Sequence, residues 1–226
     1  NQETSEEEEI DVWTIFDFPN REKKYSDFTW NFSHFDGVDW DDKSKKNAIY
    51  LLTGKNWEHE VDDENGNYDY LMGADIDFDN EEVVEELIKW GKWYYDTTSC
   101  DGFRLDAVKH IKAEFYKRWI QSMREYSGKE LFIVGEYWHK KVEALEAYLT
   151  KVDGTLSLYD VPLHFNFYQA SREKESYDLT KILSGTLVGE NPTHAVTFVD
   201  NHDTQPGQAL ESYVEAWFKP LAYSII

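Results

Sequence analysis

Residues 101–106 have the sequence Asp101-Gly102-Phe103-Arg104-Leu105-Asp106, a short apolar run that ends in a carboxylate. Side chains alternate between the two faces of a β-strand, so Arg104 and Asp106 are expected to point the same way. A cation two residues before a carboxylate keeps that carboxylate ionised. The run therefore predicts a strand that presents an ionised Asp106, the state that an enzyme nucleophile requires.

Two further runs end in the same manner. They are Phe132-Ile133-Val134-Gly135-Glu136 and Phe198-Val199-Asp200-Asn201-His202-Asp203. Glu136 follows Asp106 by about 30 residues, which is about one strand and helix unit, and Asp203 follows after about two units. We therefore expect all three carboxylates at the carboxyl ends of parallel strands, where active sites form in α/β barrels and open sheets.

Helices and strands are predicted to alternate from about Glu81 onward. Apolar residues at helical spacing predict helices over residues 83–94, 111–123, 142–149 and 210–221. Strand candidates lie at residues 102–105, 131–134, 155–159 and 195–199. This alternation predicts the α/β class with a parallel sheet, and Asp79 or Asn80 is expected to cap the first helix.

The segment from about Asp11 to Asp79 has a different composition. It is rich in aromatic residues, Asp, Asn and Gly and lacks sustained helical spacing, as in Phe28-Thr29-Trp30-Asn31-Phe32. Short strands and turns are predicted here.

Charge and cysteine content restrict the partners. Asp and Glu outnumber Lys and Arg by 45 to 23 and give a formal charge of −22, which disfavours nucleic acid and anionic lipid surfaces. A neutral substrate or a bound cation fits better, and the alternative interpretation is that the charge serves solubility alone. The lone Cys100 excludes an internal disulfide, and no apolar run approaches the roughly 20 residues of a membrane span.

Acidic residues crowd the end of the aromatic segment, at Asp69, Asp75, Asp77 and Asp79. Such a loop repels itself unless it binds a hard cation such as Ca²⁺, which needs several oxygen ligands. The spacing mimics an EF-hand, but Asn80 stands where that loop needs Gly, so an EF-hand is not expected.

The three acidic runs, in this order and spacing, resemble three signature regions of the α-amylase family of glycoside hydrolases, and most closely those of the liquefying bacterial α-amylases. The resemblance extends from about Trp13 to the C-terminus. It includes Asn65-Gly66-Asn67-Tyr68-Asp69-Tyr70-Leu71-Met72, Tyr159-Asp160-Val161-Pro162-Leu163-His164 and Asp203-Thr204-Gln205-Pro206-Gly207-Gln208.

The resemblance implies retaining endo-hydrolysis of α-1,4-glucosidic bonds in starch, with Asp106 as nucleophile, Glu136 as general acid and base, and Asp203 as a third carboxylate that grips the distorted sugar. Retention implies about 5 to 5.5 Å between the two reacting carboxyl groups. The further substrate-binding positions that the resemblance implies are Arg104, Lys109, His110, Tyr137, Trp138, Asn201 and His202.

Each of these assignments has a structural alternative. A carboxylate after a strand often caps the next helix. Lys109 is either a substrate contact or a solvated surface lysine. Trp138 and Tyr137 offer apolar faces to sugar rings, but most of the tryptophans are expected in the core.

The resemblance also implies a structural calcium and sodium cluster between an inserted domain and the barrel. Its ligands would be Asp36, Glu58, Asp69, Asp75, Asp77 and the backbone carbonyl of His110. Glu58 stands where relatives carry Asp, and its longer side chain is expected to shift or weaken the second metal. The alternative is an acidic loop without a bound ion.

The fold that follows is a partial (β/α)8 TIM barrel, about strands four to seven, preceded by part of an inserted β-rich domain. Residues 1–79 are assigned to the inserted domain and residues 80–226 to the barrel. A complete barrel needs about 250 residues, so we expect an internal piece of a longer enzyme that would fold poorly and be nearly inactive in isolation.

Two functional alternatives stay open. One is a glucan-transferring or maltooligosaccharide-forming relative, because loops decide whether water or sugar is the acceptor. The other is a non-catalytic descendant that binds glucan or another protein, although such proteins are expected to have lost a carboxylate. We expect a starch or maltooligosaccharide substrate, a monomer at full length, and neither nucleic acid nor membrane as partner. The sequence does not decide between a secreted and an intracellular location, and starch outside the cell favours export.

Overall fold

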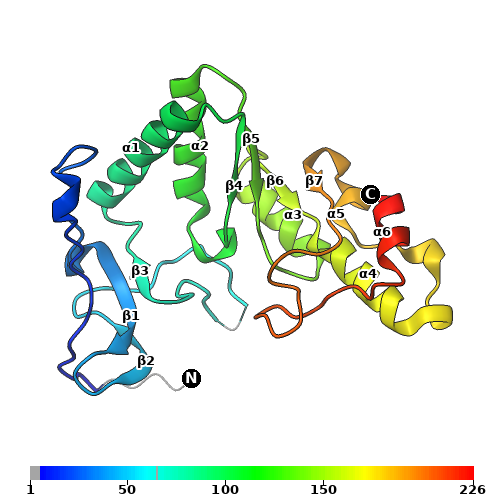
Figure 1. The fold of residues 1–226 in the computed structure, drawn as a ribbon, viewed down its shortest axis with the longest axis horizontal. Helices are drawn as coiled ribbons and strands as arrows, with labels where there is room; N and C mark the ends of the chain where they lie inside the picture. The colour runs from blue at the N-terminus through cyan, green and yellow to red at the C-terminus, as the bar shows by residue number, and fades with distance from the viewer. Residues whose placement is uncertain (1–5, 65) are drawn as a thin grey trace. The chain divides into compact units, whose positions relative to one another are not determined.

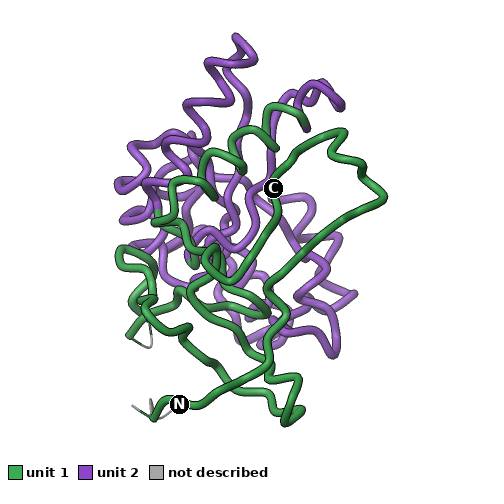
Figure 2. Tube along the Cα trace, turned by 90° about the vertical axis from the view of Figure 1, so that its left-hand side faces the viewer, with its two compact units in different colours: residues 1–93, 110–112 green, residues 94–109, 113–226 purple. Residues whose placement is uncertain are grey.

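The structure, a computed structural model, describes residues 6–64 and 66–226. These residues form two compact units, the first made of residues 6–64, 66–93 and 110–112 and the second of residues 94–109 and 113–226 (Figures 1 and 2). Asn65 of the 65–72 motif and residues 1–5 of the expected inserted domain lie outside the described residues. The expected boundary at residue 79 stays a prediction.

The first unit contains a small antiparallel sheet with the strand order β2-β1-β3 (Figure 1). Its strands are β1 (Phe35–Asp41), β2 (Lys46–Leu51) and β3 (Ala74–Ile76), and the 3-10 helices η1 (Pro19–Arg21) and η2 (Phe32–His34) precede them. The prediction of short strands and turns in the aromatic segment is therefore confirmed.

Aromatic rings build much of the interior of the first unit. The buried His34 stacks on Phe28 with ring centroids 4.7 Å apart, and Trp30 packs against both rings and against Phe35. Offset and edge-to-face contacts of this kind stabilise a core that has few long strands. The aromatic composition of the segment thus reflects packing.

Helix α1 (Glu81–Thr98) begins with the cap that the sequence predicts. The Asn80 side-chain oxygen accepts a hydrogen bond from the Glu82 amide at 3.0 Å, and the Asn80 carbonyl accepts one from the Val84 amide at 3.1 Å. Asp75 lies within β3. The acidic run is therefore a strand followed by a helix cap, and the EF-hand interpretation is excluded.

The second unit contains the predicted parallel sheet, with the strand order β4-β5-β6-β7 (Figure 1). Helices connect the strands in chain order, as the alternating pattern requires. The elements are β4 (Gly102–Leu105), η3 (Val108–His110), α2 (Ala113–Ser127), β5 (Phe132–Gly135), α3 (Val142–Lys151), β6 (Ser157–Tyr159), α4 (Val161–Glu173) and β7 (Ala195–Val196).

Tight strand pairing accounts for a glycine at the start of β4. Gly102 pairs with Phe132, and a Cβ atom at residue 102 would lie 2.2 Å from the Phe132 carbonyl oxygen. The pairing continues to Leu105 opposite Gly135. Because both strands then end together, the residues that follow them start from the same edge of the sheet.

Apolar faces of the helices form the core of the second unit. Ile120 and Met123 of α2 and Leu145 of α3 are fully buried, and Trp119 packs edge-on against Phe103 of β4 with centroids 5.1 Å apart. Burial of such side chains supplies the main favourable term in folding.

Three predicted strands differ from the structure in extent. β5 lies one residue later than expected, β6 begins at Ser157, and β7 ends at Val196 instead of Val199. The last sheet bond at this edge joins the Asp160 amide to the Val196 carbonyl at 2.9 Å. β6 ends there, so residues 197–199 have no strand beside them among the described residues and leave the sheet.

The predicted helix over residues 210–221 is wrong. Residues 203–218 follow an irregular course, and α6 spans only Lys219–Ile225. The Val214 amide donates to the Asp200 carboxylate at 3.0 Å instead of to a helical carbonyl. Val214 and Phe218 are nevertheless buried against α4, so their spacing reflected burial and not helical structure.

Helix α4 was not predicted, and the remaining short elements also fall between the predicted ones. They are η4 (Lys174–Ser176), η5 (Leu179–Lys181), α5 (Leu187–Glu190) and η6 (Pro192–His194).

A buried carboxylate joins the starts of α4 and α5. Asp160 is fully buried, and its two side-chain oxygens accept the amides of Leu163 at 3.0 Å, Leu187 at 3.1 Å and Val188 at 2.7 Å. Burial raises the pKa of Asp160, and these three bonds oppose that rise. Three orphan donors at two helix starts are thereby satisfied.

Replacement of Asp160 by Asn is expected to lower the free energy of unfolding by about 2–3 kcal/mol, because an amide NH₂ would face backbone N–H donors. Urea denaturation measures this loss. Asp178→Asn is the matched control, since Asp178 caps η5 through the Thr180 amide at the surface. Equal losses in the two variants would contradict the proposed joint between the helices.

Candidate active site

Asp106 and Glu136 lie directly after adjacent parallel strands. β4 ends at Leu105 and β5 at Gly135, and the Glu136 amide donates to the Leu105 carbonyl at 2.9 Å. Ala107 then adopts a left-handed conformation with φ 46°, after which the Val108 amide donates to the Glu136 carbonyl at 3.1 Å. A strained non-glycine residue of this kind persists where the surroundings fix it, commonly at functional sites.

A single guanidinium connects the two carboxylates. Arg104 Nη1 lies 2.6 Å from Asp106 Oδ1, and Arg104 Nη2 lies 3.1 Å from Glu136 Oε1. The expectation that Arg104 and Asp106 point the same way is confirmed by this contact. The planar guanidinium therefore orients both carboxylates through charge-assisted hydrogen bonds.

Residues 201–203 reach the same group of side chains. Asn201 Nδ2 lies 3.4 Å from Glu136 Oε1, and Asn201 Oδ1 accepts the Asp203 amide at 3.0 Å. His202 Nε2 lies 3.3 Å from Asp203 Oδ2. Arg104 therefore links the carboxylates of Asp106 and Glu136, and Asn201 links Glu136 to the backbone amide of Asp203.

Glu136 and Asp106 have unequal environments. The Glu136 side chain is only 9% exposed, whereas that of Asp106 is 71% exposed. Burial raises the pKa of Glu136, Arg104 opposes the rise, and the nearby Asp106 charge adds to it. A carboxyl with a raised pKa thus lies beside a solvent-accessible carboxylate, and acid and nucleophile chemistry needs such unequal environments.

Among the other predicted substrate positions, Lys109 and Tyr137 are buried. Lys109 Nζ donates to the Trp138 carbonyl at 3.2 Å, so Lys109 is not a solvated surface lysine. Tyr137 is 6% exposed, and its ring lies 4.8 Å from that of Tyr148. The expectation that Tyr137 offers a face to sugar is therefore corrected, because this ring belongs to the core.

Trp138 is partly buried in an aromatic cluster, with its ring centroid 5.6 Å from His164, 5.9 Å from Phe165 and 6.3 Å from Phe198. His110 belongs to the first unit, where its Nδ1 atom lies 2.6 Å from the Tyr68 carbonyl oxygen. A carbonyl only accepts hydrogen bonds, so His110 Nδ1 carries a proton.

The predicted metal ligands converge in the first unit. Carboxylate oxygens of Asp36, Asp69 and Asp75 lie within 4.8 Å of one another, and those of Asp36, Glu58 and Asp77 do so as well. Asp36 belongs to both groups, so the five side chains form one acidic cluster. β1 supplies Asp36, β3 supplies Asp75, and the loops around them supply the others.

Several oxygens of this acidic cluster are buried without a hydrogen bond. They are Asp36 Oδ2, Asp75 Oδ2 and both carboxylate oxygens of Glu58. Orphaned buried carboxylate oxygens are the donor set that a hard cation prefers, so the residues fit Ca²⁺. The longer side chain of Glu58 also places a carboxylate oxygen within 4.8 Å of those of Asp36 and Asp77.

The electrostatics of the acidic cluster favour a positive charge beside these carboxylates. Burial, followed by the charge of Asp77, raises the pKa of Asp36 to about 7. Burial raises the pKa of Glu58 to about 8 while Lys112, 3.8 Å away, opposes the rise. Burial also raises the pKa values of Asp69 and Asp75. Lys55 pairs with Asp77 and thereby supplies part of the compensation.

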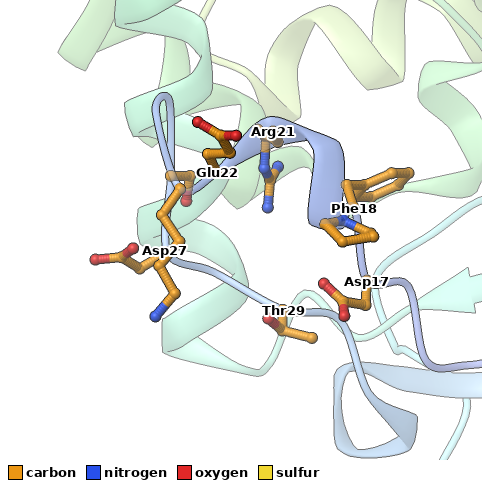
Figure 3. Close-up of a pocket in the computed structure, with 9 residues that line it drawn as sticks. Asp17, Phe18, Arg21, Glu22, Asp27 and Thr29 are labelled. Carbon is orange, nitrogen blue, oxygen red and sulfur yellow. The ribbon is translucent and has the colours of Figure 1, made fainter.

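A separate surface pocket lies in the first unit (Figure 3). Its lining combines both signs of charge with small polar residues and contains none of the predicted site residues: Asp17, Phe18, Pro19, Arg21, Glu22, Lys23, Ser26, Asp27 and Thr29. It shows no arrangement of groups that would activate a substrate.

Sequence reasoning missed three buried polar residues of the second unit. Asp160 and His164 are fully buried, and Asp200 anchors the segment that follows it. Asp160 precedes a Pro-containing helix start, which is a recognisable cap signal. His164 and Asp200 lie in runs that carry the family resemblance, but no local pattern indicated their roles. Val199 and Ser212, the partners of His164, and Val214, a partner of Asp200, are distant in sequence.

Carboxylates of unequal burial at the carboxyl edge of a parallel sheet are the arrangement that glycoside hydrolases with α/β barrels use. The family described as "Alpha amylase, catalytic domain" matches residues 5–210. An alpha-amylase from Geobacillus stearothermophilus is 56% identical over 228 residues, which cover 100% of this chain and 42% of that relative. The chain therefore belongs to the alpha-amylase family.

A second relative and one solved structure extend this finding. A glucan 1,4-alpha-maltohexaosidase from Bacillus sp. (strain 707) is 54% identical, covering 100% of this chain and 44% of the relative. The chain thus spans less than half the length of these curated relatives. The crystal structure of an alpha-amylase from Geobacillus thermoleovorans matches with a TM-score of 0.53 and 23% identity, over 68% of this chain and 38% of that one.

These matches imply a TIM-barrel-type fold, and the parallel sheet of the described residues has four strands. Among residues 6–64 and 66–226, no helix is long and apolar enough to cross a bilayer.

Proposed function

We propose that the protein hydrolyses internal α-1,4-glucosidic bonds of starch and related glucans with retention of the anomeric configuration. The observation that carries this proposal is the Arg104 guanidinium shared by an exposed Asp106 and a buried Glu136. Membership of the alpha-amylase family and the names of the relatives support the choice of glucan as substrate.

In the proposed first step, the Asp106 carboxylate attacks the anomeric carbon while Glu136 gives its proton to the departing glycosidic oxygen. The bond to the leaving sugar breaks as the bond to Asp106 forms. Glu136, now ionised, then takes a proton from water, and the resulting hydroxide displaces Asp106. Two inversions return the α configuration.

The remaining residues of the network are assigned to binding and orientation. Asp203 and His202 contact ring hydroxyls of the distorted sugar, and Arg104 orients both reacting carboxylates. Asn201 holds Glu136 through the 3.4 Å contact. Trp138, Lys109 and His110 are assigned to neighbouring sugar units.

We further assign a structural calcium ion, with sodium as a second cation, to the acidic cluster of the first unit. Asp36, Asp69, Asp75, Asp77 and Glu58 would hold it, together with the backbone carbonyl of His110. A bound cation supplies positive charge to buried carboxylates and takes no part in the bond cleavage. In the same proposal, residues 1–79 belong to an inserted β-rich domain and residues 80–226 to strands four to seven of the barrel.

The product anomer tests the mechanism. The protein at its full natural length is incubated with maltoheptaose, and proton NMR follows the new reducing ends before they mutarotate. We expect the α-anomer first, because a double displacement retains configuration. Initial formation of the β-anomer would show single displacement and contradict the role of Asp106.

The size of the products separates the proposed activity from its relatives. Endo-hydrolysis of starch is expected to give a broad early distribution of chain lengths on chromatography. One dominant maltohexaose peak would indicate maltooligosaccharide formation, and chains longer than the substrate would indicate transfer. Binding of glucan without cleavage would leave only the non-catalytic alternative.

A further inference from the structure

His164 is a buried polar residue that the proposed reaction does not use. It lies in the first turn of α4 and is 0% exposed. Its ring is stacked on that of Phe198, with centroids 5.2 Å apart and an angle of 8° between the planes. A fully buried imidazole requires partners for both nitrogens, and both are present.

The two ring nitrogens bind the two ends of one segment. His164 Nδ1 lies 2.6 Å from the Val199 carbonyl oxygen, and Nε2 lies 2.9 Å from Ser212 Oγ. The carbonyl only accepts, so Nδ1 carries the proton. Burial lowers the pKa of His164 and favours the neutral ring. Its Nε2 atom then shares the single Ser212 hydroxyl proton with the Leu210 carbonyl, which lies 2.7 Å from the same oxygen.

Hydrogen bonds within the segment between these ends, residues 200–211, hold its backbone together. Asn201 Oδ1 accepts the Thr204 amide at 3.0 Å, and Thr204 Oγ1 accepts the Asn201 amide at 3.1 Å. The return of the chain is fixed by the Ser212 amide, which donates to the Thr204 carbonyl at 3.0 Å. Residues 201–204 and Ser212 are therefore expected to move together.

This segment carries Asn201, His202 and Asp203, and it meets the acid–base carboxyl through the Asn201 contact to Glu136. A displacement of about 1 Å is enough to lose such a contact and commonly costs about 100-fold in rate. The rate of the proposed reaction is therefore expected to depend on the position of this segment.

We propose that His164 is a positioning residue, which fixes Asn201, His202 and Asp203 against Glu136 by holding the carbonyl of Val199 and the hydroxyl of Ser212. This inference rests on the proposed function. It assigns His164 no contact with substrate and no proton transfer.

Asp200 holds the same segment from another side. Its carboxylate accepts the Val214 amide at 3.0 Å and the Thr204 hydroxyl at 3.2 Å, and it pairs with Lys219 at 2.8 Å. These contacts fix the segment to the chain that returns toward α6. His164, in contrast, connects both ends of the segment to α4.

Two substitutions separate the hydrogen bonds from the packing. His164→Phe retains a ring for Phe198 but removes both bonds, whereas His164→Asn retains an N–H donor near the position of Nδ1. Asn166→Ala is the matched control on α4, because it removes the bonds to the carbonyls of Ile182 and Ser184, outside the segment.

Steady-state kinetics on maltoheptaose with the full-length protein, below the unfolding midpoint of each variant, give the first readout. We expect His164→Phe to lower kcat about 100-fold with little change in KM. His164→Asn should restore most of this loss, and Asn166→Ala should stay within about 2-fold of the original protein. A kcat for His164→Phe equal to that of the control overturns the proposal.

Amide hydrogen exchange gives a second readout that does not depend on activity. Faster exchange at residues 201–204 in His164→Phe, with unchanged exchange there in Asn166→Ala, is the expected result. Unchanged exchange at 201–204 in His164→Phe contradicts the positioning role. If the original protein cleaves no glucan, the proposed function fails, and exchange alone then decides the role of His164.

A milder variant covers the case in which His164→Phe does not fold. Ser212→Ala removes the hydroxyl partner of Nε2, together with the bond of that hydroxyl to the Leu210 carbonyl. It is expected to lower kcat about 5- to 10-fold and to accelerate exchange at residues 201–204. Original values of both quantities in Ser212→Ala overturn the proposal.

Discussion

Replacement of Glu136 by Gln is expected to lower kcat on maltooligosaccharides about 10²- to 10⁴-fold, because the amide cannot protonate the departing glycosidic oxygen. Glutamine has nearly the same shape as glutamate and keeps an oxygen for Arg104. The loss is therefore assigned to the missing proton and not to a changed fold. Steady-state assays on maltoheptaose measure it.

A substrate with a good leaving group makes this prediction specific. The nitrophenolate of a nitrophenyl maltooligosaccharide leaves without protonation. Glu136→Gln should therefore still form the glycosyl-enzyme from this substrate. Its hydrolysis needs the missing base, so the covalent adduct on Asp106 is expected to accumulate and to appear in the mass of the intact protein. Asp106→Asn should form no adduct with either substrate.

Glu143→Gln is the matched control, since Glu143 is an exposed glutamate in the first turn of α3. It should leave kcat unchanged on both substrates. Original turnover by Glu136→Gln on maltoheptaose would falsify the assignment of Glu136 as the acid.

Removal of divalent cations is expected to lower the midpoint of thermal unfolding by about 10 °C, which corresponds to loss of a ligand present at about 100 to 1,000 times its dissociation constant. The reason is the acidic cluster, whose buried oxygens would lose their compensating charge. Calorimetry with a chelator and then with excess Ca²⁺ measures the shift and its recovery.

The pH dependence of the chelated protein follows from the raised pKa values. Asp36 at about 7 and Glu58 at about 8 bind protons in the folded state that the unfolded chain has released above about pH 5. Stability without the cation is therefore greatest at low pH and falls as pH rises from about 4 toward 8. With Ca²⁺ bound, this fall should be much smaller.

Two variants isolate the acidic cluster. Asp36→Asn removes a residue shared by both ligand groups and should reduce the response to Ca²⁺. Asp41 is also buried in the first unit, but its oxygens accept hydrogen bonds from Asp11, Lys43 and Ser44. Asp41→Asn should therefore leave the response unchanged. Equal responses in the two variants would place the cation elsewhere.

Much of the sheet and the carboxylate network could be predicted, because their signals are local. A strand that ends in Arg104-Leu105-Asp106 fixes by alternation which side chains share a face, and the spacing to Glu136 sets the parallel order. The contact between Arg104 and Glu136 then follows from strand pairing. The Asn80 cap is a similarly local signal.

The errors have a common physical origin in distant contacts. Val214 and Phe218 have helical spacing, but the Asp200 carboxylate takes the Val214 amide and prevents a helix there. The sequence suggested that Tyr137 offers its ring to sugar, but the ring packs against that of Tyr148 of α3. His164 binds residues about 35 and 48 positions away, so no window of sequence contains the pattern.

Lys55 and Lys112 extend their ammonium groups to the carboxylates of the first unit. The protein thus possesses built-in counter-ions, which take up part of the mutual repulsion when the medium is poor in salts. In a solution that contains a chelator, these lysines predict a partial loss of stability that added Ca²⁺ reverses, instead of complete unfolding.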